Sequence, residues 1–183
     1  MTARITIKAE RDKPIVNQHP WVFSGAISSV KGNPVPGDIV DVFSSKGTFL
    51  ARGYWNEKSQ MQVRILTWHD EPIDDAWWFN ALQRSIKSRP SQGMARLVNA
   101  ESDYLPGLVV DRYGDWLVLQ ALTFGIDLRK ERIAEFLREL VKSRGIYERS
   151  DVDVRRKEGL EEVKGVLWGE EPPALIEVDI DAR

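Results

Sequence analysis

The stretch HPWVFSGAI at residues 19–27 places a histidine and two large aromatic side chains just before a turn of small residues. Two kinds of chemistry fit this pattern. The rings of His19, Trp21 and Phe23 can stack on splayed bases, which is a standard contact between proteins and RNA. Large aromatic side chains in a small domain are also commonly buried in its core. The stretch alone leaves both interpretations open.

A second group of side chains that can do chemistry is acidic. Glu101, Asp103, Asp111 and Asp115 lie within NAESDYLPGLVVDRYGD, and a carboxylate cluster can bind a metal ion or act in acid–base catalysis. However, Asp103 and Asp115 flank predicted turns, where acids commonly make local hydrogen bonds. Asp111 alternates with two valines on a predicted strand. We therefore favour a structural role for this cluster.

The densest run of charge is RSDVDVRRKEGLEEVKG at residues 149–165. A solvated surface is the default interpretation of such a run. Its basic side chains can instead face a phosphate backbone, where Lys and Arg give an affinity that depends on salt. The interleaved Asp151 and Asp153 weaken that idea and indicate internal ion pairs. The candidates for secondary RNA contacts are Arg149, Arg155, Arg156 and Lys157.

The composition excludes several classes of catalyst. The chain has no cysteine, so disulfides, thiolate metal sites and a cysteine nucleophile are ruled out. No two glycines are separated by a single residue, so the GxG fingerprint of dinucleotide and S-adenosylmethionine sites is absent, as is a Walker loop. His19 and His69 are too few for a histidine-based metal site, and we expect His69 to be structural. We predict no catalytic residue and no metal ligand.

Charge is distributed unevenly along the chain. Residues 1–70 carry nine Lys or Arg and six Asp or Glu, whereas residues 71–183 carry 17 and 22. This difference in net charge indicates two modules with different functions, although it is also within the ordinary variation of charge along a chain. The 42% hydrophobic and 30% charged content is typical of a globular protein. No stretch approaches the ~20 apolar residues of a membrane span, and we expect a cytoplasmic protein without membrane contact.

Short strands separated by turns fill residues 1–70. Apolar and polar residues alternate at 3–8, and further strands are predicted at 39–43, 48–55 and 61–68. Turns with Gly or Pro, such as VPGD and SSKG, separate them. Residues 17–24 are predicted as a short helical turn or loop. Together these signals predict a small closed or nearly closed β barrel.

The hydrophobic period changes at residues 70–90. Trp78, Leu82 and Ile86 recur at helical spacing, with Phe79 beside them. Asp74 or Asp75 can cap the start of this helix, and Pro90 lies just past its end. We interpret residues 71–92 as a helix that links the barrel to the second module.

The second module, residues 93–183, mixes strands with one strong helix. A strand is predicted at 95–102 and a hairpin at 107–122 that turns near Gly114. GIYERS and DVDVRR are predicted as extended segments, and GVLWGE as a last strand. The predicted helix spans residues 127–145, with Asp127 as its cap and Gly145 as its stop. Its apolar face consists of Ile133, Phe136, Leu137, Leu140 and Val141.

The tail PPALIEVDIDAR is predicted as a further strand that has no visible partner. Because proteins usually avoid an unpaired strand edge, we expect the chain to be a piece of something longer. The fold class is α+β: a β pseudo-barrel followed by a small α+β domain.

These segments resemble a known family. HPWVFSGAI and PGDIVDVFSSKGTFLARGYWNEKSQMQVRIL look like the PUA domain, an RNA-binding barrel, and in particular its form at the N-terminus of bacterial class I S-adenosylmethionine-dependent rRNA large-subunit methyltransferases. RLVNAESDYLPGLVVDRYGD and IYERSDVDVRRKEGLEEVKGVLWGEEPP resemble the central α+β domain of these enzymes, which make 5-methylcytosine in 23S rRNA. The resemblance covers essentially the whole chain in order.

The resemblance implies where RNA would bind. HPWVF resembles the first short helix beside the RNA-facing groove, with Val22 and Phe23 in the core. Burial and stacking are equally expected for Trp21, and outward strand positions without RNA contact are an equal alternative for Arg52 and Arg64. The residues placed on or near the groove are His19, Trp21, Lys31, Arg52, Tyr54, Trp55 and Arg64.

The family also implies a Rossmann-like catalytic domain after residue 183, with S-adenosylmethionine and a cysteine nucleophile. We therefore expect rRNA as partner, no cofactor in this chain and no methylation by it alone, with a dimer or a separate catalytic domain as a further contact. The first hypothesis is the RNA-binding, substrate-docking part of a 23S rRNA cytosine-5 methyltransferase. The alternatives are a truncated gene product without independent activity and a non-catalytic RNA-binding adaptor.

Overall fold

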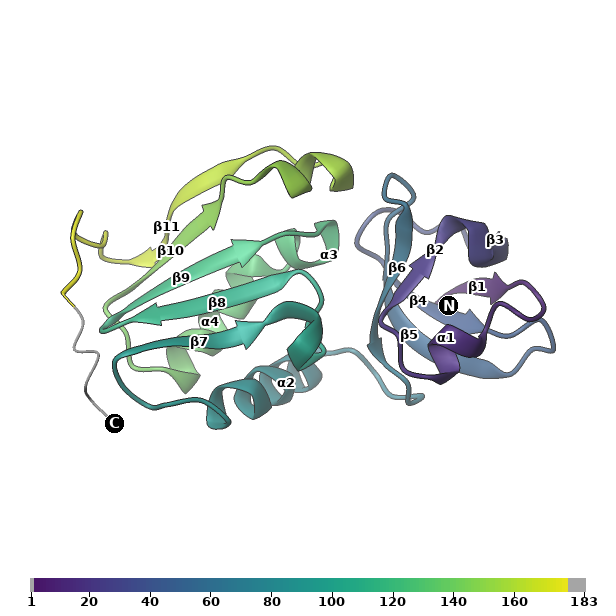
Figure 1. The fold of residues 1–183 in the computed structure, drawn as a ribbon, viewed down its shortest axis with the longest axis horizontal. Helices are drawn as coiled ribbons and strands as arrows, with labels where there is room; N and C mark the ends of the chain where they lie inside the picture. The colour runs from purple at the N-terminus through teal and green to yellow at the C-terminus, as the bar shows by residue number, and fades with distance from the viewer. Residues whose placement is uncertain (1, 178–183) are drawn as a thin grey trace.

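Six short strands form the first domain. In the computed structural model, which describes residues 2–177, they pair in the order β2-β6-β5-β4-β1-β3 and curl around a core (Figure 1). β1 runs parallel to β4 and antiparallel to β3. The barrel strands predicted from alternation are confirmed. The strands are β1 (Ala3–Ile7), β2 (Trp21–Phe23), β3 (Ile27–Lys31), β4 (Ile39–Phe43), β5 (Phe49–Trp55) and β6 (Met61–Thr67).

The core of the first domain follows from the period of two along its strands. Every second residue of β1 is buried, and β4 buries its two valines in the same way. β5 and β6 approach each other closely at Gly53, where a Cβ atom would lie 2.1 Å from the carbonyl oxygen of Arg64. The core side chains are Ala3, Ile5, Ile7, Ile15, Val22, Val40, Val42, Ala51, Trp55, Val63 and Ile65.

The segment before β3 differs from its prediction. A short helix, α1 (Lys13–Val16), precedes it, and residues 21–23 form β2 rather than a helical turn. Since neighbouring side chains of a strand point to opposite faces, Val22 enters the core and Phe23 cannot follow it. Val22 is 1% exposed, as predicted, but Phe23 is 46% exposed, so its predicted core position is wrong. A 3₁₀ turn, η1 (Ser24–Ala26), leads into β3.

The second domain is a five-stranded sheet in the order β11-β10-β9-β8-β7. The hairpin of β8 and β9 turns at Gly114 as predicted, and β10 is parallel to β9. A parallel pair needs a long crossover, which the intervening helices provide. The strands are β7 (Met94–Asn99), β8 (Leu108–Tyr113), β9 (Trp116–Ala121), β10 (Gly145–Ser150) and β11 (Val163–Gly169).

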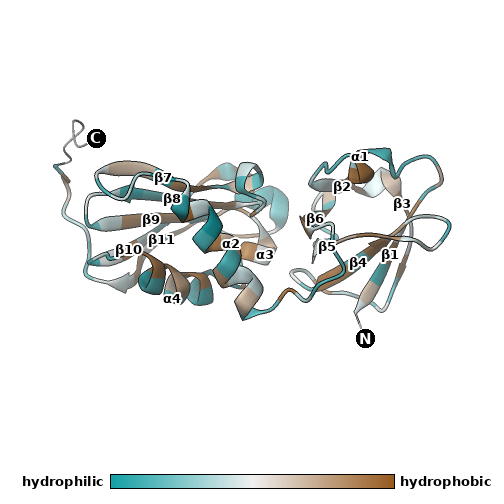
Figure 2. Cartoon of the chain, turned by 90° about the horizontal axis from the view of Figure 1, so that it is seen from below, coloured by the Kyte–Doolittle hydropathy of each residue, from teal (hydrophilic) through white to brown (hydrophobic). Residues whose placement is uncertain are grey.

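Two helices, α2 (Asp75–Lys87) and α4 (Lys130–Leu140), lie on the same side of this sheet (Figure 2). The Asp74 side chain accepts a hydrogen bond from the backbone N–H of Trp77 at 2.9 Å, which confirms the predicted cap. α2 does more than link the domains, because Trp78 and Leu82 are buried in the core of the second domain. The predicted apolar face of α4 also enters this core.

Several predicted boundaries in the second domain are wrong. Asp127 ends a short helix, α3 (Phe124–Asp127), instead of capping α4. Gly145 begins β10 instead of stopping a helix, which already ends at Leu140. DVDVRR is not extended, since residues 153–158 form the 3₁₀ helix η3 (Asp153–Glu158). Of the predicted tail strand, residues 172–177 are not in a strand and residues 178–183 lie outside the described residues.

The two domains lie side by side along the long axis of the molecule (Figure 1). Their cores are not independent, because Tyr54 of β5 and Leu66 of β6 pack into the core of the second domain. A 3₁₀ turn of the second domain, η2 (Ala100–Asp103), and η3 both contact the first domain through polar side chains. The fold therefore creates a junction where residues from both domains meet.

Candidate RNA-binding surface and domain junction

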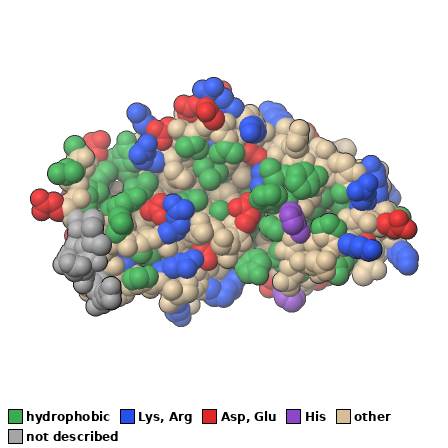
Figure 3. Space-filling model, in the orientation of Figure 1, with side chains coloured by type: hydrophobic (Ala, Val, Ile, Leu, Met, Phe, Trp, Pro, Cys, Tyr) green, Lys and Arg blue, Asp and Glu red, His purple; other side chains and the backbone are tan. Residues whose placement is uncertain are grey.

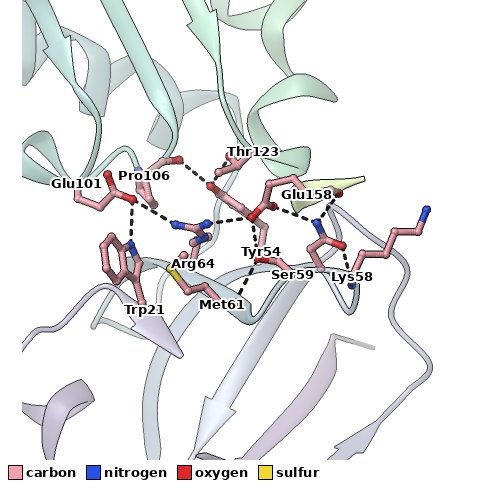
Figure 4. Close-up of polar contacts among 11 residues, drawn as sticks. Trp21, Tyr54, Lys58, Ser59, Met61, Arg64, Glu101, Pro106, Thr123 and Glu158 are labelled. Atoms are coloured by element: carbon pink, nitrogen blue, oxygen red, sulfur yellow. Dashed lines mark hydrogen bonds and ion pairs between the residues drawn. The ribbon is translucent and has the colours of Figure 1, made fainter. Parts of the chain in front are cut away.

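Arg64 extends from β6 across the junction toward two acids of the second domain (Figure 4). Its Nη2 lies 2.9 Å from Glu158 Oε1, and its Nη1 lies 3.4 Å from Glu101 Oε1. The Arg64 side chain is 8% exposed and that of Glu158 is 3% exposed. Removing these charges from water is costly unless they are paired and hydrogen-bonded, and the Arg64 guanidinium is paired on both sides.

Glu158 receives further hydrogen bonds from the loop between β5 and β6 (Figure 4). Ser59 Oγ donates to Glu158 Oε1 at 2.7 Å, and Asn56 Nδ2 donates to Oε2 at 3.0 Å. The same Asn56 amide also donates to the carbonyl oxygen of Glu158 at 2.9 Å. η3 is therefore held against the first domain by a carboxylate with partners on both of its oxygens.

Tyr54 of β5 forms a second polar contact of the junction. Its hydroxyl donates to the carbonyl oxygen of Pro106 at 2.6 Å and lies 2.7 Å from Thr123 Oγ1. The side chain is fully buried, and this burial raises the pKa of Tyr54 above its ordinary value. Gly125 lies against the ring, because a Cβ atom there would be 2.3 Å from Tyr54 Cγ.

Three of the residues predicted to line an RNA groove are therefore buried. Tyr54 and Arg64 lie in the junction, since the second domain covers this part of β5 and β6. Trp55 is 5% exposed in the first core, and its indole N–H donates to Glu57 at 3.1 Å. Their predicted placement on an open groove is corrected: these side chains hold the fold and the domain junction together.

Trp21 and His19 lie at the rim of the junction. The indole N–H of Trp21 donates to Glu101 Oε1 at 2.9 Å, and the Trp21 ring is half-buried. The exposed ring of His19 meets the Trp21 ring edge to face, with centroids 5.4 Å apart. Phe23 continues the row at 6.3 Å from Trp21. The structure thus presents three neighbouring rings at the surface, two of them among the predicted contacts.

Arg52 is committed to partners within the protein. Its Nε lies 2.6 Å from Asp41, its Nη2 lies 2.9 Å from Asp70, and the side chain is only 15% exposed. The hydrogen bond to Asp41 raises the pKa of Arg52. Lys31, in contrast, is exposed on the edge strand β3. Of these two predicted contacts, only the lysine offers a charge that is open to solvent.

The basic candidates of the second domain also divide into one buried side chain and three exposed ones. Arg155 is 1% exposed, and its Nη1 lies 2.9 Å from Asp127, so it is not placed on the surface as predicted. Arg149 and Arg156 have side chains 60% and 71% exposed, and Lys157 is also exposed. Arg149 lies 3.4 Å from Asp151, which confirms one of the expected internal ion pairs.

Three acids of this cluster, Glu101, Asp103 and Asp111, are held in structural pairs, as expected. Asp103 accepts from Arg89 at 2.9 Å, and Asp111 pairs with Arg96 at 2.8 Å. Within residues 2–177, no group of three or more His, Cys, Asp or Glu side chains is arranged to hold a metal ion. No helix in this part of the chain is long and apolar enough to cross a membrane.

Sequence reasoning missed the acids that complete the junction. Glu158 lies in the densest run of charge, for which a solvated surface is the default interpretation. Glu101 lies in the acidic cluster, for which a structural role was predicted without a partner. A buried arginine must be paired with acids. This rule predicts partners such as Glu101 and Glu158 only when the burial of Arg64 is known, and the sequence does not show that burial. Because Arg64 and Glu158 are 94 positions apart in the sequence, no local pattern connects them.

Comparisons with known proteins agree with this architecture. Residues 5–68 match the family model of the PUA-like domain. Over 97% of its length the chain is 43% identical to ribosomal RNA large subunit methyltransferase I of Aeromonas hydrophila, of which it covers 47%. Over 94% of its length it is 42% identical to the protein of that name from Tolumonas auensis, of which it covers 45%. The chain thus spans about half the length of these curated relatives.

Two solved structures share the fold. A Streptococcus mutans protein assigned as a SAM-dependent methyltransferase matches 94% of this chain and 44% of its own with a TM-score of 0.77 and 17% identity. A protein assigned as a methyltransferase and complexed with SAH matches 97% of this chain and 45% of its own, with a TM-score of 0.77 and 16% identity. At such identities the likeness concerns the fold alone.

Proposed function

We propose that this chain is the RNA-binding and substrate-docking part of a 23S rRNA 5-methylcytosine methyltransferase. The proposal rests on its homology to ribosomal RNA large subunit methyltransferase I and on its PUA-like domain. The observation that supports the proposal is the 43% identity to a ribosomal RNA large subunit methyltransferase I along 97% of the chain. In this proposal the PUA-like domain holds rRNA, and the second domain positions it for modification.

The domain junction supports a docking role. Methyl transfer to one base needs the RNA to be held in a fixed orientation relative to the reacting groups. Buried contacts through Arg64, Tyr54 and Glu158 connect the two domains, so RNA bound to the first domain is positioned relative to the second. A flexible linker between them would lose that orientation.

The chain's own chemistry favours docking over methyl transfer. Attack on C6 of cytosine needs a thiolate nucleophile, and the chain has no cysteine. A methyl-donor site would need space beside a glycine turn between a strand and a helix. Gly125 stands at such a place, after β9 and within α3, but the ring of Tyr54 fills the space beside it. Within residues 2–177 this turn does not fit S-adenosylmethionine, and the proposal gives it no role in holding the cofactor.

The proposed RNA contacts are the candidates that remain accessible. His19 and Trp21 would stack on bases at the rim of the junction. Phosphates would meet the exposed charges of Lys31, Arg149, Arg156 and Lys157.

A salt series tests the proposal. Fluorescence anisotropy with a folded large-subunit rRNA fragment should show binding that weakens as salt rises, because phosphate contacts release counterions. The variants Lys31→Ala and Lys157→Ala should each weaken binding and reduce the salt slope by about 1. Lys46→Ala, at another exposed lysine, is the matched control and should bind as the wild type does. Absence of binding at low salt would remove the proposal.

A further inference from the structure

A cleft on the side of the junction is lined by aromatic rings from both domains. Its volume is about 400 Å³, within the range of about 300–1,000 Å³ that small-molecule sites occupy. Figure 3 shows hydrophobic side chains gathered where the two domains meet on this face, with Lys and Arg scattered among acids rather than forming one basic patch. The lining residues are Gln18, Leu66, Thr67, Trp68, His69, Glu71, Trp77, Arg84 and Tyr104.

Rings of fixed orientation form the walls of this cleft. Trp68 follows β6, and its indole N–H donates to the carbonyl oxygen of Ile15 at 2.7 Å. Tyr104 follows η2 and meets the Trp68 ring edge to face with centroids 5.8 Å apart, while remaining 51% exposed. Trp77 of α2 is held from the other side, because its indole N–H donates to Glu71 Oε1 at 3.2 Å. Such prearranged rings cost little entropy when a flat ligand stacks on them.

A carboxylate lies among these rings with one oxygen already used. Thr67 Oγ1 donates to Glu71 Oε1 at 2.6 Å, and the Trp77 indole donates to the same oxygen. Glu71 Oε2 has no hydrogen-bond partner among residues 2–177. A carboxylate oxygen can accept hydrogen bonds from the amino or imino N–H groups on the edge of a nucleobase. Glu71 is therefore suited to read the edge of a stacked base.

The cleft also offers a positive charge. Arg84 of α2 is exposed and makes no ion pair within the described part of the chain. A guanidinium binds phosphate through paired N–H groups that match its oxygens. Rings, a hydrogen-bond acceptor and a phosphate-binding cation are the three groups that recognise a nucleotide.

Two lining residues adopt an unusual backbone conformation. Gln18 has φ of 61° and Tyr104 has φ of 58°, both in the left-handed region that non-glycine residues rarely adopt. Residues 2–177 contain five such non-glycine residues, and two of them border this one cleft. Strain of this kind persists where the surrounding structure holds it, and it concentrates at ligand sites. At position 104 it projects an exposed ring into the cleft.

We propose that this cleft binds one unpaired base of a single-stranded RNA segment. The base stacks on Tyr104, its N–H groups face Glu71, and the adjoining phosphate meets Arg84. The inference rests on the proposed RNA-binding function and deepens it, because it assigns recognition of an unpaired base to a site between the domains.

Substitution of Tyr104 in the 183-residue chain tests the cleft. Tyr104→Asn removes the ring but keeps a residue that tolerates the left-handed conformation, and Tyr104→Phe keeps the ring. Each variant is titrated by anisotropy with a short fluorescein-labelled single-stranded RNA and with a fully paired duplex of the same sequence. Because one stacked base contributes on the order of 1–3 kcal/mol, Tyr104→Asn should weaken single-strand binding about tenfold or more. Tyr104→Phe should bind within about twofold of the wild type.

Met94→Ala is the matched control, since Met94 is exposed to a similar extent as Tyr104 but lies outside the cleft and is not among the proposed RNA contacts. It should leave single-strand binding unchanged, and duplex binding should not respond to Tyr104→Asn. Arg84→Ala should also weaken the single strand and lower its salt slope by about 1. Equal single-strand affinity of Tyr104→Asn and the wild type would overturn the cleft inference alone. A wild-type chain that binds neither RNA would overturn the proposed function and the inference with it.

Discussion

Arg64 and Glu158 lie 94 residues apart in the sequence, and their side chains meet at 2.9 Å in the junction between the two domains. Both side chains are buried, so each charge needs the other as its partner. Among residues 2–70, Arg64 is the one charged residue that is buried, and Glu158 ends the 3₁₀ helix η3. The pair makes the two domains one unit, which the proposed docking function requires.

Breaking this pair should be costly. Arg64→Leu would leave the Glu158 carboxylate buried without its counter-charge, and loss of one partner of a buried pair typically costs about 3–5 kcal/mol of unfolding free energy. Urea unfolding measures the effect. Arg144→Leu is the control, because the Arg144–Glu170 pair has side chains 57% and 61% exposed and should contribute at most about 1 kcal/mol. A similar small loss in both variants would show that Arg64 does not hold the junction.

Tyr54 should make stability depend on alkaline pH. Its buried phenol has a pKa raised above the ordinary value of 10.0, so the unfolded chain releases this proton first. The stabilisation is complete below pH 10 and is lost as the pH rises from there toward the folded-state pKa. Urea unfolding of the wild type and of Tyr54→Phe, repeated from pH 7 upward, measures this effect.

At neutral pH, Tyr54→Phe should lose about 1–3 kcal/mol, because the carbonyl oxygen of Pro106 loses a buried donor. The difference in unfolding free energy between the wild type and Tyr54→Phe should then become smaller above pH 10. A difference that stays constant with pH would mean that Tyr54 titrates equally in the folded and unfolded states.

Glycine is required at position 53 but not at position 25. A Cβ atom at Gly53 would lie 2.1 Å from the Arg64 carbonyl oxygen, so Gly53→Ala must push β5 away from β6. We expect a loss of about 2 kcal/mol or more, as for overpacking in a core. At Gly25 a Cβ atom meets nothing within 4 Å, and Gly25→Ala should change stability by less than about 0.5 kcal/mol. Thermal unfolding of the two variants distinguishes them, and equal losses would contradict the close approach of the strands.

Local patterns predicted the elements well where one period dominates. The alternation of ARITIK became β1, and the helical spacing of Trp78 and Leu82 became α2 with its Asp74 cap. The state of HPWVF was harder to predict, because only its last three residues form the strand β2, and three residues are too few to distinguish a strand from a turn. Its state as β2 depends on pairing with β6, which lies 40 residues later, so that Trp21 faces Arg64.

The candidate site shows a different limit of sequence reasoning. A residue type and its position on a strand do not tell which face a second domain will cover. Arg64 and Tyr54 therefore looked like surface residues, and the cleft around Tyr104 had no sequence signal, since its rings come from three separate segments. The left-handed conformation of Tyr104 follows from the end of η2 and is not encoded by a glycine.

Two adjacent arginines, Arg155 and Arg156, should behave in opposite ways. Arg155 Nε donates to the carbonyl oxygen of Glu161 at 2.7 Å, and its guanidinium also contacts Asp127 and the carbonyl oxygen of Ala121. Since it is 1% exposed, Arg155→Ala should leave these acceptors unpaired and cost about 3 kcal/mol or more of unfolding free energy.

Arg156 is 71% exposed in its side chain and pairs with Glu162 at the surface. Arg156→Ala should change stability by less than about 1 kcal/mol, while weakening rRNA binding and reducing the salt slope by about 1 if this residue contacts a phosphate. Urea unfolding and the salt series, run on both variants, separate the two roles. A stable Arg155→Ala protein would contradict the structural role, and an unchanged slope in Arg156→Ala would remove Arg156 from the RNA surface.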